Sequence, residues 1–379
     1  MKGDAITTLS DVCESVRYGY TASSSTDVCG PRFLRITDIV PDSVDWETVP
    51  YCEIDEADKD RFALSVGDIV VARTGATVGY AKFIRESVDA VFASYLVRFR
   101  VDATKADPTF IGKLVESQAY KSFVQSRIGG AAQPNASAPV LGSFQFRLPA
   151  RYAQQRIADI LSAYDDLIEN NRRRMALLEE AARQVYQEWF VRLRFPGYEH
   201  TRIVDGVPEG WEKTPLESAL VLQRGFDLPS QDRSDGSVQI YASTGVNGYH
   251  NVAKVQAPGI VTGRSGSLGK VHYVYEDYWP LNTTLWIKEF RRVSPLFAYF
   301  LLSSLNLEQY NGGVSVPTLD RKVVHRIEVV VPPAKIQSLF GEYVMPMFSQ
   351  VRQLGLYNDK LRTARDLLLP KLMSGEIAV

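Results

Sequence analysis

The chain has few of the residues that several common kinds of site require. It contains only three cysteines (Cys13, Cys29 and Cys52) and four histidines among 379 residues, with no Cys-x-x-Cys pair. An odd, widely spaced set of cysteines does not make a disulfide framework, so we expect a reduced, cytoplasmic protein. The same scarcity of cysteine and histidine argues against a structural zinc site.

Long apolar runs and a strong charge of one sign are also missing. No apolar stretch approaches the roughly 20 residues of a membrane-spanning helix, and the amino terminus MKGDAITTLSD has no apolar signal region. We therefore expect no membrane association. The formal net charge is −1, so overall charge does not predict nucleic-acid binding, which depends on where basic side chains lie.

Recognisable catalytic motifs are absent as well. An adenine methyltransferase needs Asn or Asp before Pro-Pro and an aromatic residue after it, whereas Val331 precedes the only Pro-Pro pair, Pro332–Pro333. The closest candidate for a nuclease metal site is PDSVDWE (41–47), which lacks a convincing partner lysine. We predict that the chain is not an enzyme by itself and holds no cofactor or metal.

What the chain does contain is an internal repeat. The stretch VGDIVVARTGATVGYAKF (66–83) matches APGIVTGRSGSLGKVHY (257–273), in which an apolar run is followed by arginine, a hydroxyl residue and glycine. The first copy has Tyr80 where the second has Lys270, so the shared feature is not a phosphate-binding lysine, and the glycine spacing does not fit a P-loop. We predict two strands joined by a tight turn whose glycines adopt positive φ.

The repeat continues downstream of these turns. GGAAQPNASAPVLGSFQFRLPARYAQQ (129–155) matches GGVSVPTLDRKVVHRIEVVVPPAKIQ (312–337), and one constant offset carries Pro134 to Pro317 and Gln154 to Gln337. A duplicated chain of this length predicts two similar domains, each with its own core.

A long helical segment follows each repeated region. No proline or glycine occurs between Pro149 and Pro196, and apolar residues there alternate spacings of four and three, the heptad pattern of a coiled coil. The same offset finds this pattern again at the carboxyl end. The predicted seam comprises Ile157, Leu161, Tyr164, Ile168, Asn171, Met175, Leu178, Val351, Leu354, Asn358 and Leu361.

Polar and helix-breaking residues interrupt this seam. We expect Pro346 to kink or divide the second helix, and we expect helix pairing to loosen beyond Arg365. A buried asparagine fixes register at a cost in stability, so Asn171 and Asn358 are predicted to meet across an antiparallel pair. The alternative is that each segment is an ordinary amphipathic helix packed on its neighbouring domain.

At this point the chain resembles a known family. PARYAQQRIADILSAYDDLIENNRRRMALLEEAARQVYQEWF (149–190) and LRTARDLLLPKLMSGEI (361–377), with its Leu-Pro-Lys-Leu-x-Ser-Gly-Glu ending, are similar to the two conserved regions of the specificity subunit of type I restriction-modification systems. The resemblance implies an α+β fold: two similar mixed α/β target-recognition domains separated by two long antiparallel helices that form an intramolecular coiled coil, with a pseudo-twofold repeat. The expected segments are recognition domains at 1–150 and 197–332 and conserved helices at 151–196 and 333–379.

The resemblance also implies partners. Each recognition domain is expected to read half of a bipartite, asymmetric double-stranded DNA site, with the helices setting the gap. Two methyltransferase subunits are expected to dock on the helical regions, and restriction/translocase subunits to join them. The methyltransferase contacts implied in this way are Trp189, Phe190, Leu368, Leu369, Lys371 and Leu372. Plain coiled-coil packing is the alternative for the apolar members of this set.

Base reading requires polar, basic or aromatic side chains on loops held by a rigid scaffold. SVRYGYT (15–21) and LQRGFDL (222–228) occupy corresponding places, so Arg17 with Tyr18 and Arg224 with Phe226 are predicted to be equivalent pairs. The candidate DNA-binding residues are Arg17, Tyr18, Tyr20, Arg73, Thr74, Gln133, Asn135, Arg224, Phe226, Ser243, Thr244, Asn247, Arg264, Ser265, Lys270 and Thr318. For each, a solvated loop position or a core aromatic is the competing interpretation. A scaffold that binds proteins rather than DNA through two β-rich domains is the alternative function.

Overall fold

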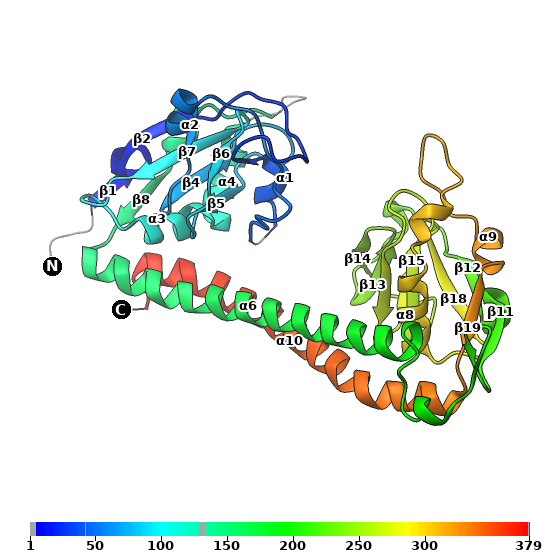
Figure 1. Ribbon diagram of the computed structural model, residues 1–379. Helices are drawn as coiled ribbons and strands as arrows, with labels where there is room; N and C mark the ends of the chain where they lie inside the picture. The colour runs from blue at the N-terminus through cyan, green and yellow to red at the C-terminus, as the bar shows by residue number, and fades with distance from the viewer. Residues whose placement is uncertain (1–4, 42, 129–133, 378) are drawn as a thin grey trace. The chain divides into compact units, whose positions relative to one another are not determined.

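The computed structural model describes residues 5–41, 43–128, 134–377 and 379 and divides the chain into two compact units. Unit 1 combines the chain up to Asn171 with Leu356–Val379, and unit 2 spans Arg172–Gly355. Two long helices, α6 (Arg151–Tyr186) and α10 (Ala334–Ser374), run through both units (Figure 1). Each helix has one part in unit 1 and the other part in unit 2. No helix in the described ranges is long and apolar enough to cross a membrane.

Unit 1 is built on a four-stranded antiparallel sheet in the order β2-β7-β4-β5. Two further pairs of strands belong to unit 1. Strands β3 and β6 pair in parallel, and strands β1 and β8 pair antiparallel. The strands are β1 (Ala5–Thr8), β2 (Cys13–Tyr18), β3 (Arg32–Leu34), β4 (Asp68–Ala72), β5 (Ala81–Phe83), β6 (Ala90–Phe92), β7 (Leu96–Val101) and β8 (Gln145–Leu148). The shorter helices are α1 (Ile36–Ile39), α2 (Glu56–Phe62), α3 (Pro108–Val115), α4 (Gln118–Arg127) and α5 (Ala138–Gly142).

Unit 2 repeats this plan with a sheet in the order β12-β18-β15-β16. The parallel pair β13-β17 and the antiparallel pair β11-β19 also recur, while β14 extends the former and has no counterpart among the described residues of unit 1. The strands are β9 (Ile203–Val204), β10 (Val207–Pro208), β11 (Glu212–Pro215), β12 (Leu220–Arg224), β13 (Val238–Ala242), β14 (Gly245–His250), β15 (Gly259–Gly263), β16 (Val271–Val274), β17 (Tyr278–Pro280), β18 (Thr284–Phe290) and β19 (Glu328–Val331). The shorter helices are α7 (Leu216–Ala219), α8 (Pro295–Ser304) and α9 (Arg321–His325).

Local sequence explains the duplicated elements. The central strand β4, with the sequence DIVVA, is buried along its whole length, as is β15 with GIVTG, because β-branched residues pack well on both faces of a covered strand. The helices α3 and α8 both begin with proline after a capping side chain. Asp107 accepts from the backbone N–H groups at the start of α3, and Ser294 does so for α8. Each cap accepts hydrogen bonds from backbone N–H groups that have no partner within the first turn of the helix.

A repeated glutamine connects each long helix to its own unit. Gln154 in α6 accepts a hydrogen bond from the backbone N–H of Asp107 at 2.7 Å and donates to the carbonyl of Pro149 at 2.8 Å. Gln337 in α10 makes the same pair of bonds, with the N–H of Ser294 at 2.7 Å and the carbonyl of Pro332 at 2.9 Å. Both amides are buried, so the geometry of each helix start relative to α3 or α8 is fixed by bonds that water cannot replace.

The helices pair within each unit, which confirms the predicted antiparallel helices. In unit 1, Ile157 and Leu161 of α6 share a buried core with Leu372 of α10. In unit 2, Tyr186 of α6 shares a core with Phe340 of α10. The seam residues predicted from the sequence are all buried or half-buried, and α6 ends in one π-helical turn at Gln187–Val191.

Asn171 and Asn358 lie side by side within unit 1. Nδ2 of Asn171 donates to Oδ1 of Asn358 at 2.8 Å, and Nδ2 of Asn358 donates to the carbonyl of Ile168 at 3.2 Å. Both side chains are buried. Each buried amide therefore has a hydrogen-bond partner inside the seam.

The expected division of the second helix at Pro346 and the expected loosening beyond Arg365 were both wrong, whereas a kink at Pro346 stays a prediction. The helix α10 runs unbroken across Pro346, because Pro346 and Glu342, whose carbonyl loses its helical partner, both lie on the exposed face. Pairing also does not loosen at Arg365. Its Nη1 donates to Asp165 of α6 at 2.6 Å, and Leu372 beyond it is still buried.

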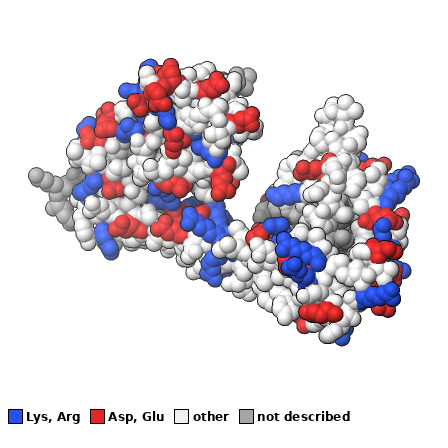
Figure 2. Space-filling view, viewed as in Figure 1, with Lys and Arg blue, Asp and Glu red and all other residues white. Residues whose placement is uncertain are grey.

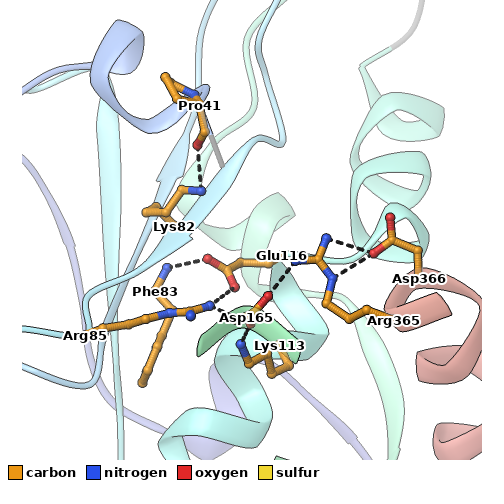
Figure 3. Close-up of polar contacts among 9 residues, drawn as sticks. All are labelled: Pro41, Lys82, Phe83, Arg85, Lys113, Glu116, Asp165, Arg365 and Asp366. Carbon is orange, nitrogen blue, oxygen red and sulfur yellow. Dashed lines mark hydrogen bonds and ion pairs between the residues drawn. The ribbon is translucent and has the colours of Figure 1, made fainter. Parts of the chain in front are cut away.

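Asp165 is the centre of a buried ion cluster in unit 1 (Figure 3). Besides Arg365, it accepts hydrogen bonds from Lys113 of α3 and, at 2.8 Å, from Arg85 in the segment after β5. The side chains of Asp165 and Lys113 are 8% and 5% exposed, so the cluster ties the unit 1 sheet and α3 to both long helices with interactions that salt screens little.

Candidate nucleic-acid interface

The predicted arginine turn of unit 1 connects β4 to β5. Gly75 has φ of 78° and Gly79 has φ of 86°, backbone values that residues other than glycine rarely adopt. The turn is attached to the loop that follows α4. Thr74 forms an isolated antiparallel β-bridge with Asn135. The backbone N–H of Gly75 donates to the carbonyl of Pro134 at 3.0 Å, and that of Ala136 donates to the carbonyl of Arg73 at 2.8 Å.

Arg73 is held in a defined position on this turn. Its guanidinium lies 4.7 Å from the centre of the Tyr18 ring, and its Nη2 donates to Oδ1 of Asn135 at 3.3 Å. The Tyr18 hydroxyl in turn accepts from the backbone N–H of Ala138 at 2.9 Å. Nε of Arg73 has no partner among the described residues. The result is a preorganised cationic group flanked by polar side chains, the kind of arrangement that recognises base edges or phosphates.

Unit 2 builds the same turn between β15 and β16. Gly266 and Gly269 have φ of 90° and 81°, and Ser265 bridges Thr318. Gly266 donates to the carbonyl of Pro317 at 2.9 Å. In each unit, the Arg-[Ser/Thr]-Gly turn and the proline end of the Gly-Gly…Pro motif are thus two parts of one structure.

The side chains on the shared backbone differ between the units. Arg264 has no aromatic ring stacked on it among the described residues, and its Nη1 donates to the carbonyl of Asn282 at 3.2 Å. Asn282 also donates to Asp227, which pairs with Arg224 at 3.1 Å. A network of alternating charge and amide groups in unit 2 therefore replaces the Tyr18–Arg73–Asn135 group of unit 1.

The remaining candidates in unit 2 fall into two groups. Ser243 lies against the turn, 3.4 Å from the position that a Cβ on Gly266 would take. Thr244, Asn247 and Lys270 are exposed at the edge of this region, and Asn247 accepts from Arg233 through its carbonyl and its side chain. In unit 1, Arg17 is exposed and donates to the carbonyl of Arg61, while Gln133 lies outside the described residues.

The predicted equivalence of Arg17 with Tyr18 in unit 1 to Arg224 with Phe226 in unit 2 is wrong. Gly19 and Gly225 are the equivalent residues, because each packs directly against a backbone carbonyl, of Ala93 and of Leu281. Tyr20 and Phe226 each follow this glycine and form the same parallel bridge to Ala93 and Leu281. In the repeat, Tyr18 of unit 1 therefore corresponds to Arg224 of unit 2, and Arg17 corresponds to Gln223.

Tyr20 and Phe226 are packed inside their units. The ring of Tyr20 lies 5.3 Å from that of Phe62, and the ring of Phe226 lies 6.1 Å from that of Trp286. The competing interpretation of these two residues as core aromatics fits this packing. As DNA contacts they stay predictions.

A segment that was not identified from the sequence supports each arginine from the other side. The backbone N–H of Arg73 donates to the carbonyl of Tyr95 at 3.0 Å, and that of Arg264 to the carbonyl of Thr283 at 2.8 Å. The Tyr95 side chain is 60% exposed, and Asn282 precedes Thr283. A further match between FASYLVRF (92–99) and PLNTTLWI (280–287) is the signal that could have identified both.

The residues implied as methyltransferase contacts are mostly used within their own unit. Trp189 and Phe190 pack on Phe340 with ring centres 6.0 and 5.0 Å apart. Leu368, Leu369 and Leu372 pack against the core of unit 1, whereas Lys371 is exposed and pairs with Glu376. Among the described residues, no group of three or more His, Cys, Asp or Glu side chains is placed to hold a metal ion.

Comparisons with known proteins agree on one family. The model of the type I restriction modification DNA specificity domain matches residues 3–180. The type I restriction enzyme MjaIX specificity subunit of Methanocaldococcus jannaschii is 24% identical over 70% of this chain and 68% of its own length. The HindI specificity subunit of Haemophilus influenzae is 23% identical over 86% of this chain and 91% of its own.

A solved structure shares the fold. The specificity subunit of the type I restriction-modification system from M. genitalium superposes with a TM-score of 0.56 at 18% identity, covering 98% of this chain and 97% of that one. The duplicated units, the paired helices and the match at residues 3–180 lead to one conclusion: the chain is similar to the specificity subunits of type I restriction-modification systems.

Proposed function

We propose that the chain reads a bipartite, asymmetric double-stranded DNA site, with one half read by each unit, and holds two methyltransferase subunits together with restriction/translocase subunits. The observation that carries this proposal is the arginine turn, built twice on the same pinned backbone with different side chains around it. A common scaffold gives both units the same approach to the duplex, and the differing side chains give each a different preference.

The finer assignments belong to the same proposal. Residues 1–150 and 197–332 would be the recognition domains, and the helical segments 151–196 and 333–379 would set the gap between half-sites and carry the methyltransferase contacts. The chain would contribute recognition and assembly but no chemistry, and it would act in the cytoplasm, where chromosomal DNA lies. The absence of a strong net charge favours selective over general binding, because little affinity comes from charge alone.

The test begins with selection of duplexes from a random pool by the full chain, alone or with its methyltransferase subunits. We expect a strong preference for sequences with two fixed blocks separated by a fixed gap. Equal recovery of all duplexes, or failure to bind at low salt, would instead favour the protein-interaction scaffold. Mapping methylated adenines in the source genome would identify the same motif independently.

A substitution then assigns one block to unit 1. Arg73→Lys keeps the positive charge but loses the planar group that lies on Tyr18 and bonds to Asn135. We expect roughly tenfold weaker binding to the selected duplex, relaxed preference in one block only, and an unchanged salt dependence.

The matched control is Arg151→Lys, at the start of α6, where the guanidinium bonds to the carbonyl of Ala103. This variant should bind like the parent chain. Equal losses for Arg73→Lys on selected and unselected duplexes would contradict a base-reading role for Arg73.

A further inference from the structure

The loop that supports the arginine turn of unit 2 has a rigid base. Asn311 bridges Leu319, and the backbone N–H of Gly312 donates to the carbonyl of Thr318 at 2.9 Å. The Asn311 side chain accepts from the N–H groups of Gly313 and Thr318, each at 2.9 Å. The loop is therefore closed at its base before any partner binds, which lowers the entropy lost on binding.

The tip of this loop is apolar and projects from unit 2. Val314 is fully exposed and Val316 is 52% exposed. The segment 311–319 contains no charged residue, and the corresponding projection is uncharged in Figure 2. A Cβ on Gly313 would lie 1.9 Å from the carbonyl oxygen of Val316, so this tight turn, which directs Val314 outward, requires glycine.

The tip is continuous with the candidate interface. Gly266 of the arginine turn donates to the carbonyl of Pro317, the residue after Val316, and Ser265 bridges Thr318. The loop that carries Val314 is therefore attached at its base to the turn that carries Arg264 and Ser265. Charged side chains at such a position would favour phosphates, whereas a branched apolar side chain gains only from an apolar feature of the partner.

We propose that Val314 is a specificity-determining residue that contacts the 5-methyl group of a thymine in the half-site bound by unit 2. The thymine methyl is the apolar group that the major groove presents at base edges. Valine has the size for this contact and is short compared with the phenylalanine, leucine or methionine side chains that wedge between base pairs. This inference rests on the proposed function.

The experiment removes the methyl group from the DNA and the valine from the protein. Each thymine of a pool-selected duplex is replaced in turn by deoxyuridine, which lacks only the 5-methyl group. With the full chain, one replacement should weaken binding about fourfold, the loss that corresponds to about 0.8 kcal/mol for one buried methyl group. The Val314→Ser variant should bind the duplexes with thymine and with deoxyuridine at that position equally well. Its affinity for both should match that of the full chain for the deoxyuridine duplex.

The control is Val66→Ser, a change to a valine that is 57% exposed at the opposite end of β4 from Arg73. This variant should keep the full sensitivity to deoxyuridine, and both variants should unfold at the temperature of the parent chain. If no deoxyuridine affects the parent, or if Val314→Ser keeps the sensitivity, the contact does not exist. If the pool yields no preferred duplex, the proposed function fails together with this inference.

Discussion

At the scale of single residues, the structure separates groups on the loops of the candidate interface from groups buried behind them. Arg73, Arg264 and Val314 lie on the loops of the candidate interface, whereas His325 is buried behind β12, the strand that ends at Arg224. Nε2 of His325 accepts a hydrogen bond from the backbone N–H of Leu222 at 2.9 Å. Because that nitrogen acts as an acceptor, the imidazole is neutral in the folded unit.

This arrangement predicts a pH dependence of stability. Burial lowers the pKa of His325 from its ordinary value of 6.5, despite Glu217 at 3.8 Å from Nδ1. The unfolded chain therefore binds a proton at a pH where the folded one does not, so stability should be lost as the pH falls below 6.5 and unaffected by this group above it. Thermal unfolding of the chain between about pH 7.5 and pH 5 measures the effect.

The comparison variant is His325→Gln, whose side chain retains an acceptor for the Leu222 N–H but does not titrate in this range. It should lose less stability on acidification than the parent chain. His272, whose pKa burial also lowers, titrates equally in both proteins, so only the difference between them reports on His325. Identical pH profiles would show that His325 contributes nothing.

At the scale of elements, the buried asparagines specify which helices pair. Under the offset that relates the two halves of the chain, Asn171 corresponds to Leu354 and Asn358 corresponds to Met175. Pairing of α6 with α10 therefore brings the two asparagines together, whereas pairing of two copies of α6 would bury Asn171 against methionine. An unpaired buried amide is costly, so the seam favours the pair formed within one chain.

A double-mutant cycle tests this assignment. Asn171→Leu alone leaves Oδ1 of Asn358 buried without its donor and should cost about 1–3 kcal/mol of stability. Asn171→Leu with Asn358→Leu should recover much of that loss, because two leucines pack in the seam without unsatisfied groups. The measurement is the denaturation midpoint of each protein.

Met175→Leu is the control for a volume-conserving change in the same seam and should cost less than about 1.5 kcal/mol. Additive losses from the two asparagine substitutions would show that the amides do not act as a pair.

At the scale of the whole molecule, the helices are the part whose length the sequence sets directly. The helix α6 is continuous across the boundary between the units, and so is α10. Adding one heptad to both helices, after Asn171 and after Gly355, keeps the seam in phase and adds about 10 Å at roughly 1.5 Å per residue. We expect the selected DNA motif to keep both blocks and gain about three base pairs in the gap, at roughly 3.4 Å per pair.

Insertion of the heptad into α6 alone is the control. It should disrupt pairing between α6 and α10 and destabilise the chain, because the two helices would no longer match in length. Unchanged gap length in the doubly extended protein would contradict the role of the helices as a spacer.

The sequence by itself determined the duplication, the paired helices and the position of the two arginine turns. Heptad spacing, glycine at turns and the correspondence between Gln154 and Gln337 are local or periodic signals, and local chemistry fixes their structural meaning. The same signals led to the asparagine pair, because a polar residue in an apolar seam stands out.

Only the tertiary structure decided how the pieces meet. The pairing of the arginine turn with the loop around Asn135 or Thr318 joins segments that lie far apart in the chain, and nothing in either segment names the other. The register of Gly19 with Gly225 depended on close packing against carbonyls of distant strands, and Arg365 proved to be held by Asp165 across two helices. Such contacts depend on three-dimensional proximity, which composition and spacing along the chain do not encode locally.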